Sequence, residues 1–191
     1  RIHSRGWLNC GASITQKPKG YPLMNEIYCR AVAAAIFGGD SSESVVNIAR
    51  LNLVNESLTE LPDGAFDIIT GVNGYRSSWS FQDISSMHKI LSFHSSTKIS
   101  KSNSIVSRHE DNGEDDLFPT FVNAVVTATI YAVQEGITKA DSIQMPFIDL
   151  FGSELRFMLK DVISNSGNYD EIYYESHHDV KDGEETERGA N

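Results

Sequence analysis

Basic residues are scarce in this chain, and long apolar runs are missing. Its 191 residues hold 16 Lys and Arg against 26 Asp and Glu, which leaves a formal net charge of −10. Because phosphate binding relies on clustered Lys and Arg, nucleic acid is not an expected partner. No stretch approaches the ~20 consecutive apolar residues that a transmembrane helix needs, so we expect no membrane span of the chain's own.

Cysteines are also few. Cys10 and Cys29 are the two in the sequence, and neither forms a CxxC pair or lies near a histidine with the spacing of zinc ligands. A metal site is therefore not expected, and two alternatives stay open for the pair, a disulfide or two free thiols. The adjacent His177 and His178 belong to an acidic tail, where exposure to solvent is the simpler interpretation than metal binding.

Glycine-rich phosphate loops and catalytic groupings are absent as well. Gly38-Gly39 follows a helical segment, whereas a phosphate-binding loop opens one. His109-Glu110-Asp111 lies in an acidic loop with no nucleophile nearby in the sequence, so catalysis is not expected there. We therefore expect neither a cofactor nor enzymatic activity.

The first third of the sequence alternates strand-like and helix-like segments. Residues 24–37 place apolar side chains at helical spacing before Gly38-Gly39, and short apolar or alternating runs before and after them are typical of strands. In order, the segments are a strand at 7–13, the helix at 24–37, a strand at 45–53, a helical turn at 57–63 and a strand at 66–70. This order predicts an α/β fold, with a short, mostly parallel sheet flanked by helices.

The rest of the chain changes character twice. Residues 77–107 hold twelve serines and only scattered apolar positions, which predicts irregular polypeptide or at best a weak strand pair. Apolar periodicity returns at 120–134 and at 153–164, and both stretches are predicted helices. The last fifteen residues are polar and acidic.

Several of these segments resemble one protein family, in the right order. GWLNCG at 6–11 and IYCRAVAAAIFGGD at 27–40 resemble the first lobe of the general L-amino-acid-binding periplasmic proteins that serve polar amino-acid ABC transporters, solute-binding protein family 3. The resemblance continues through LTELPDGAFDIITG and SSWSFQD, and then through segments similar to the family's return to that lobe and its terminal helices: residues 58–71, 77–83, 106–134, 136–140 and 155–174.

The resemblance implies a single lobe of a type II periplasmic-binding-protein fold, because the family's second lobe of roughly a hundred residues has no counterpart between these segments. It divides the chain into a first part of lobe one, a serine-rich and acidic connection that replaces lobe two, the returning helices of lobe one and an acidic tail: residues 1–76, 77–117, 118–175 and 176–191. It also implies a Cys10–Cys29 disulfide, since both positions match cysteines of the family.

The same resemblance locates a ligand site and indicates that it is weakened. In the family an arginine binds the ligand's carboxylate, and the matching stretch here reads Phe81-Gln82-Asp83. Arg76 lies upstream and is a possible substitute, although a surface arginine is the simpler interpretation. Ser13, Tyr75 and Trp79 are the other residues expected at the remaining face of the crevice, with packing as the simpler interpretation of the two aromatic side chains.

Two functions follow from a lobe without its partner. The first is a non-enzymatic accessory subunit that docks onto protein subunits of a larger assembly, membrane-bound or organellar, for example a photosystem. The second is an extracytoplasmic amino-acid-binding protein of an ABC transporter, whose ligand site is weakened or completed by a partner. A chain that begins at Arg1 without an apolar signal segment fits a processed protein in a non-cytosolic compartment, either periplasm-like or organellar (plastid or mitochondrial).

Overall fold

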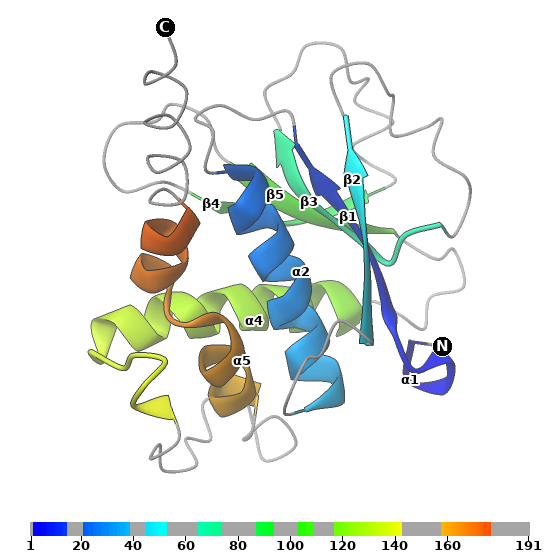
Figure 1. Cartoon of the computed structure of the whole chain (residues 1–191). Helices are drawn as coiled ribbons and strands as arrows, with labels where there is room; N and C mark the ends of the chain where they lie inside the picture. The colour runs from blue at the N-terminus through cyan, green and yellow to red at the C-terminus, as the bar shows by residue number, and fades with distance from the viewer. Residues whose placement is uncertain are drawn as a thin grey trace, which may run out of the picture.

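The strands of the chain lie side by side in one sheet (Figure 1). The computed structural model describes residues 2–14, 21–38, 45–52, 65–73, 87–93, 103–108, 117–142 and 158–176. Within these residues the sheet has five strands in the order β2-β1-β3-β5-β4. The strands are β1 (Leu8–Ser13), β2 (Val46–Leu51), β3 (Ile68–Asn73), β4 (Met87–Phe93) and β5 (Asn103–Arg108).

The sheet is parallel in the half that the sequence predicts best. β1 pairs in parallel with β2 on one side and with β3 on the other. β5 then pairs antiparallel with both β3 and β4, so β4 runs in the same direction as the first three strands. The predicted α/β class, with a mostly parallel sheet flanked by helices, is confirmed.

Helices account for most of the remaining described residues. They are α1 (Ile2–Arg5), α2 (Tyr21–Phe37), α4 (Leu117–Gln134) and α5 (Met158–Ser166), and residues 169–176 are helical as well. α2 and α4 begin earlier than the predicted residues 24 and 120. α2 ends where the sequence predicts, because Gly38 adopts a φ of 73°, a left-handed conformation that terminates helices.

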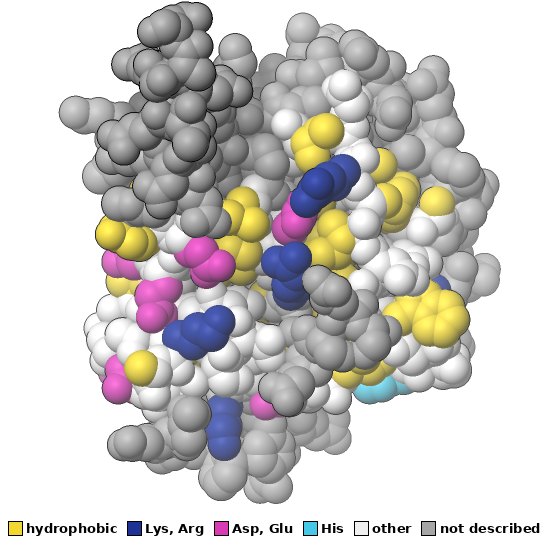
Figure 2. All heavy atoms as spheres, in the orientation of Figure 1, with side chains coloured by type: hydrophobic (Ala, Val, Ile, Leu, Met, Phe, Trp, Pro, Cys, Tyr) yellow, Lys and Arg dark blue, Asp and Glu magenta, His cyan; other side chains and the backbone are white. Residues whose placement is uncertain are grey.

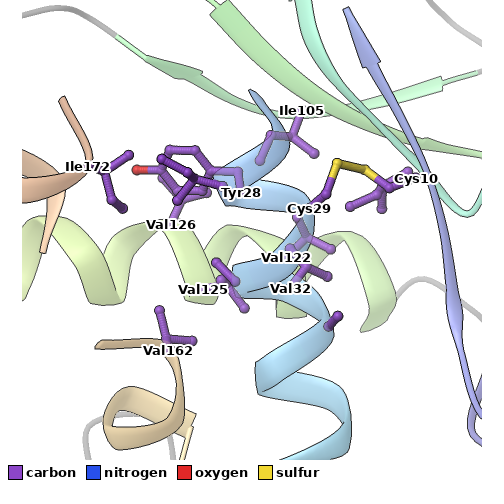
Figure 3. Packing of buried hydrophobic residues seen from close by; sticks show 14 of the residues in the cluster. Cys10, Tyr28, Cys29, Val32, Ile105, Val122, Val125, Val126, Val162 and Ile172 are labelled. Atoms are coloured by element: carbon purple, nitrogen blue, oxygen red, sulfur yellow. A yellow bond between two sulfur atoms is a disulfide. The ribbon is translucent and has the colours of Figure 1, made fainter. Parts of the chain in front are cut away.

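The main core lies between α2, α4 and the sheet. Figure 1 shows α2 running along the sheet and α4 crossing behind α2. Figure 3 shows apolar side chains of the two helices meeting where they cross. α2 contributes small and aromatic side chains, α4 contributes valines, and β5 contributes Ile105, all of them buried. Tyr28 of α2 crosses this core, and its hydroxyl lies 3.1 Å from Oγ1 of Thr129 on α4. Burial raises the pKa of Tyr28 far above its ordinary value.

The serine-rich stretch contributes to the sheet. β4 and all but the last residue of β5 fall within residues 77–107, and the two strands form an antiparallel pair. This confirms the alternative of a strand pair over irregular polypeptide. Their connection, residues 94–102, and the longest undescribed internal stretch, residues 143–157, are both far below the ~40 residues at which a domain folds without extra support. The described strands all belong to one sheet, so the described residues form a single lobe.

The amino ends of β1 and β3 are joined by side chains. Asp67 accepts hydrogen bonds from the backbone nitrogen of Asn9, at 2.8 Å, and from the guanidinium of Arg5. The same arginine donates to the carbonyl of Trp7 and lies over its ring. In the part of the chain that the structure describes, no helix has the length and apolarity needed to cross a bilayer.

Candidate functional site

The carboxyl ends of β1 and β3 mark a reversal in strand order. The chain leaves β1 for β2 on one side, while β3 lies on the other side of β1. In open α/β sheets, ligands bind outside the carboxyl ends of the strands at such a reversal. The register pairs Ala12 with Thr70, so Ser13 and Gly71, the next residues along the two strands, lie at this carboxyl edge.

Asn25 of α2 connects the helix to both strands at the carboxyl edge. The side-chain Nδ2 of Asn25 donates a hydrogen bond of 2.8 Å to the backbone carbonyl of Ser13. The backbone carbonyl of Asn25 accepts a hydrogen bond of 3.0 Å from Oγ1 of Thr70. Asn25 is only 4% exposed, so these bonds form away from water and leave few of its polar groups unsatisfied. The start of α2 is therefore held in one position against the ends of β1 and β3.

Gly71 is the residue that permits this close approach. It adopts a φ of 80° at the point where the pairing of β3 with β5 shifts register, between Thr70 and Val72. A Cβ on Gly71 would collide with Nδ2 of Asn25. Both the backbone conformation and the space therefore require glycine here.

A charged group lies beside Asn25, on the neighbouring residue of α2. Glu26 is buried, and its Oε1 accepts a hydrogen bond of 2.7 Å from Nε of Arg50, at the end of β2. Its Oε2 lies 3.7 Å from Nη2 of Arg30, one helical turn along α2. Figure 2 shows basic and acidic side chains together on the surface over α2 and β2.

The two arginines outnumber the carboxylate between them. The hydrogen bond to Glu26 raises the pKa of the Arg50 guanidinium above its ordinary value. The side chain of Arg50 is 70% exposed, whereas that of Glu26 is 10% exposed. This group therefore presents positive charge to solvent beside the carboxyl edge.

The Cys10–Cys29 disulfide predicted from the family resemblance is present. It joins the middle of β1 to α2 with a Cα–Cα distance of 5.9 Å (Figure 3), and both residues are fully buried. Oγ1 of Thr70 lies 3.6 Å from Sγ of Cys29. α2 is thus attached to β1 covalently and, through Asn25, by hydrogen bonds at the carboxyl edge.

The structure places one of the four predicted ligand-binding residues. Ser13 is at the carboxyl edge and is 1% exposed, and its backbone carbonyl is already engaged by Asn25. Tyr75, Arg76 and Trp79 follow β3 and lie outside the described residues, as does the Phe81-Gln82-Asp83 stretch. Their predicted roles remain predictions.

Sequence reasoning missed Asn25, Glu26 and Arg50. A signal was available, because Asn25 and Glu26 interrupt the otherwise apolar first half of α2. Their partners Ser13, Gly71 and Arg50 are distant in sequence, and only the strand register identifies them. Among the described residues, no three His, Cys, Asp or Glu side chains converge as metal ligands do, and the pair His177-His178 lies outside those residues.

Comparison with solved structures identifies the architecture. The chain is similar to an ABC transporter periplasmic binding protein from Brucella ovis with glutathione bound, with a TM-score of 0.64 and 15% sequence identity. The match covers 90% of this chain and 88% of that chain. The fold is therefore that of a periplasmic binding protein, present here as a single lobe. No protein-family model matches the sequence, and no curated protein matches it.

Proposed function

We propose that this chain is a non-enzymatic, extracytoplasmic solute-binding lobe that contacts a small polar ligand at the carboxyl edge of β1 and β3. The observation that carries the proposal is the arrangement of Asn25, Ser13 and Gly71 at the reversal in strand order. This arrangement lowers the stability of the fold, because it needs a glycine with positive φ and a buried amide. It lies where α/β sheets bind ligands.

The proposed ligand is an amino acid or a short peptide. The resemblance of the sequence to amino-acid-binding proteins supports the first, and the glutathione bound by the similar Brucella protein supports the second. Both carry carboxylate and ammonium groups that hydrogen-bond to backbone and side-chain groups at strand ends.

A second wall for the ligand has to come from outside this lobe. The described strands form one sheet, so the described residues supply no second lobe that would close over the edge. Losing one wall removes a large share of the contacts and leaves the ligand's polar groups competing with water. The site is therefore weak in the isolated chain and is completed by a partner.

Docking onto a larger assembly is the second candidate function. It is favoured by the exposure of Ile14, an apolar side chain directly after β1 that is 42% exposed. In this alternative the carboxyl edge is a protein interface of an accessory subunit, and the ligand site is lost. The two candidates differ in whether any solute binds once the partner is present.

Calorimetric titration distinguishes them. The native protein and the isolated chain are each titrated with a panel of L-amino acids and with glutathione. The proposal predicts a dissociation constant of about 1 mM or weaker for the isolated chain, equivalent to roughly 4 kcal/mol, and tighter binding in the native assembly. Micromolar binding by the isolated chain would contradict completion by a partner. Absence of binding in both states would contradict solute binding and favour the accessory subunit.

A further inference from the structure

We infer that Arg50 is a specificity-determining residue of the proposed ligand site, and that it binds a carboxylate of the ligand. This inference rests on the proposed function and adds the chemical group that is recognised. It assigns the role to a residue at the end of β2, away from the segment after β3 where sequence resemblance placed the anchoring arginine.

The position of Arg50 follows from the strand register. Arg50 pairs with Ala12, the residue before Ser13, and Leu51 pairs with Ser13 itself. The Arg50 side chain reaches Glu26, the sequence neighbour of Asn25, so it lies on the face of the sheet that α2 covers. Adjacent strands are about 4.8 Å apart, so the backbone of Arg50 on β2 lies about that far from the end of β1. This distance is within the length of an arginine side chain.

The chemistry of Arg50 suits an anion. Nε is bound to Glu26 at 2.7 Å, so the planar guanidinium is held in one orientation by a carboxylate that is itself buried. Among the described residues the structure assigns no other contact to its remaining nitrogens, and the side chain is 70% exposed. A guanidinium oriented in this way offers its terminal N–H groups for a two-pronged bond to a carboxylate, at a reduced cost in side-chain entropy.

The local charge balance favours the same conclusion. Among the described residues, Glu26 is the carboxylate that pairs with both Arg50 and Arg30, so a single positive charge is left over in this group of three. A ligand carboxylate would neutralise it. Arg30 is one turn farther along α2, so it supplies a matched control with the same charge and the same carboxylate partner.

The test compares glutathione with glutathione ethyl ester, in which one carboxylate is blocked, on the native protein and on three variants. Arg50→Gln is expected to weaken glutathione binding about tenfold or more, as for the loss of a charged hydrogen bond. It is also expected to abolish the preference for glutathione over the ester. Arg50→Lys keeps the charge but lacks the planar pair of N–H donors, so it should retain part of the affinity. Arg30→Gln removes the same charge one helical turn away and should weaken binding clearly less than Arg50→Gln.

The outcomes separate this inference from the proposed function. If the unmodified protein binds glutathione and Arg50→Gln binds it equally well, the role of Arg50 is wrong and solute binding stands. An equal loss in Arg30→Gln and Arg50→Gln would also overturn it, because general charge would then explain the effect. If the unmodified protein binds neither glutathione nor any amino acid, the proposed function fails and the inference fails with it. Circular dichroism checks that each variant is folded.

Discussion

Gly71 lies where β3 packs against the start of α2, and no side chain fits there. Gly71→Ala would bring a methyl group into Asn25 and impose a left-handed conformation on alanine. We expect a loss of about 2–4 kcal/mol in the free energy of unfolding, from overpacking and backbone strain together. Urea denaturation followed by circular dichroism measures it.

Gly136→Ala is the control for this prediction. Gly136 has a similar φ of 68°, but a Cβ there would meet no atom within 4 Å. Only backbone strain should remain, about 1 kcal/mol. Equal losses in the two variants would show that Asn25 does not pack against Gly71 as described.

Tyr28 has its hydroxyl group in the middle of the core. Tyr28→Phe removes the hydrogen bond to Thr129, while the Thr129 hydroxyl keeps its bond to the carbonyl of Val126. The expected loss is therefore modest, about 0.5–1.5 kcal/mol in the free energy of unfolding. Tyr131→Phe, at a partly exposed position on α4, should change stability by less than about 0.5 kcal/mol. A larger loss in Tyr131→Phe than in Tyr28→Phe would contradict this description of the core.

Asp141 reports on the turn after α4. Hydrogen bonds from the Thr138 hydroxyl, at 2.6 Å, and from the Thr138 backbone nitrogen lower the pKa of Asp141. A lowered pKa in the folded state means that the charged carboxylate stabilises the turn above the unfolded pKa. That contribution is lost as the pH falls through the folded pKa.

Thr138→Val should therefore raise the pKa of Asp141, and Thr138→Ser should leave it lowered. Carbon-detected NMR titration of the carboxyl group measures both. The same pKa in all three proteins would mean that the Thr138 hydroxyl is not the main cause.

At the scale of elements, the disulfide is the principal covalent link between β1 and α2. A bond that closes a separation of 19 residues stabilises by about 3 kcal/mol on chain-entropy grounds. Replacing both cysteines by alanine should lower the free energy of unfolding by roughly that amount. Urea denaturation of the double variant checks it, with the reduced unmodified protein as the second comparison. An unchanged midpoint would mean that hydrogen bonds at the carboxyl edge suffice to hold α2.

The elements that could be predicted from the sequence are those with a local signal. α2 and α4 show apolar periodicity, and β1, β2 and β3 show short apolar runs, so the parallel half of the sheet follows from their order. β5 has little such signal because serines occupy most of its neighbourhood. The side chain of Ile105 is fully buried, and its place in the core is identified only by the pairing of β5 with β3.

The candidate site was harder to predict for a related reason. Ser13 and the disulfide came from resemblance to a family. The contacts of Asn25 with Ser13 and of Glu26 with Arg50 join residues that are distant in the chain, and no local pattern encodes such pairs. The sequence does not distinguish Gly71 from a loop glycine, and only its φ and its contact with Asn25 show that glycine is required there.

At the scale of the whole molecule, the two edges of the parallel strands are built differently. The amino edge is joined by Asp67 with Arg5 and Asn9. The carboxyl edge has a buried amide, a glycine with positive φ and an exposed guanidinium beside them. We therefore expect ligand contact to be confined to the carboxyl edge.

The most direct test is the mapping of backbone amide shifts in the ¹⁵N-labelled protein during titration with glutathione and with L-amino acids. If the ligand contacts only the carboxyl edge, the amide signals of Ser13, Ile14, Gly71 and Val72 should shift saturably, and those of Asn9 and Asp67 at the opposite edge should stay constant. Saturable shifts that centre on Asn9 and Asp67 instead would contradict it.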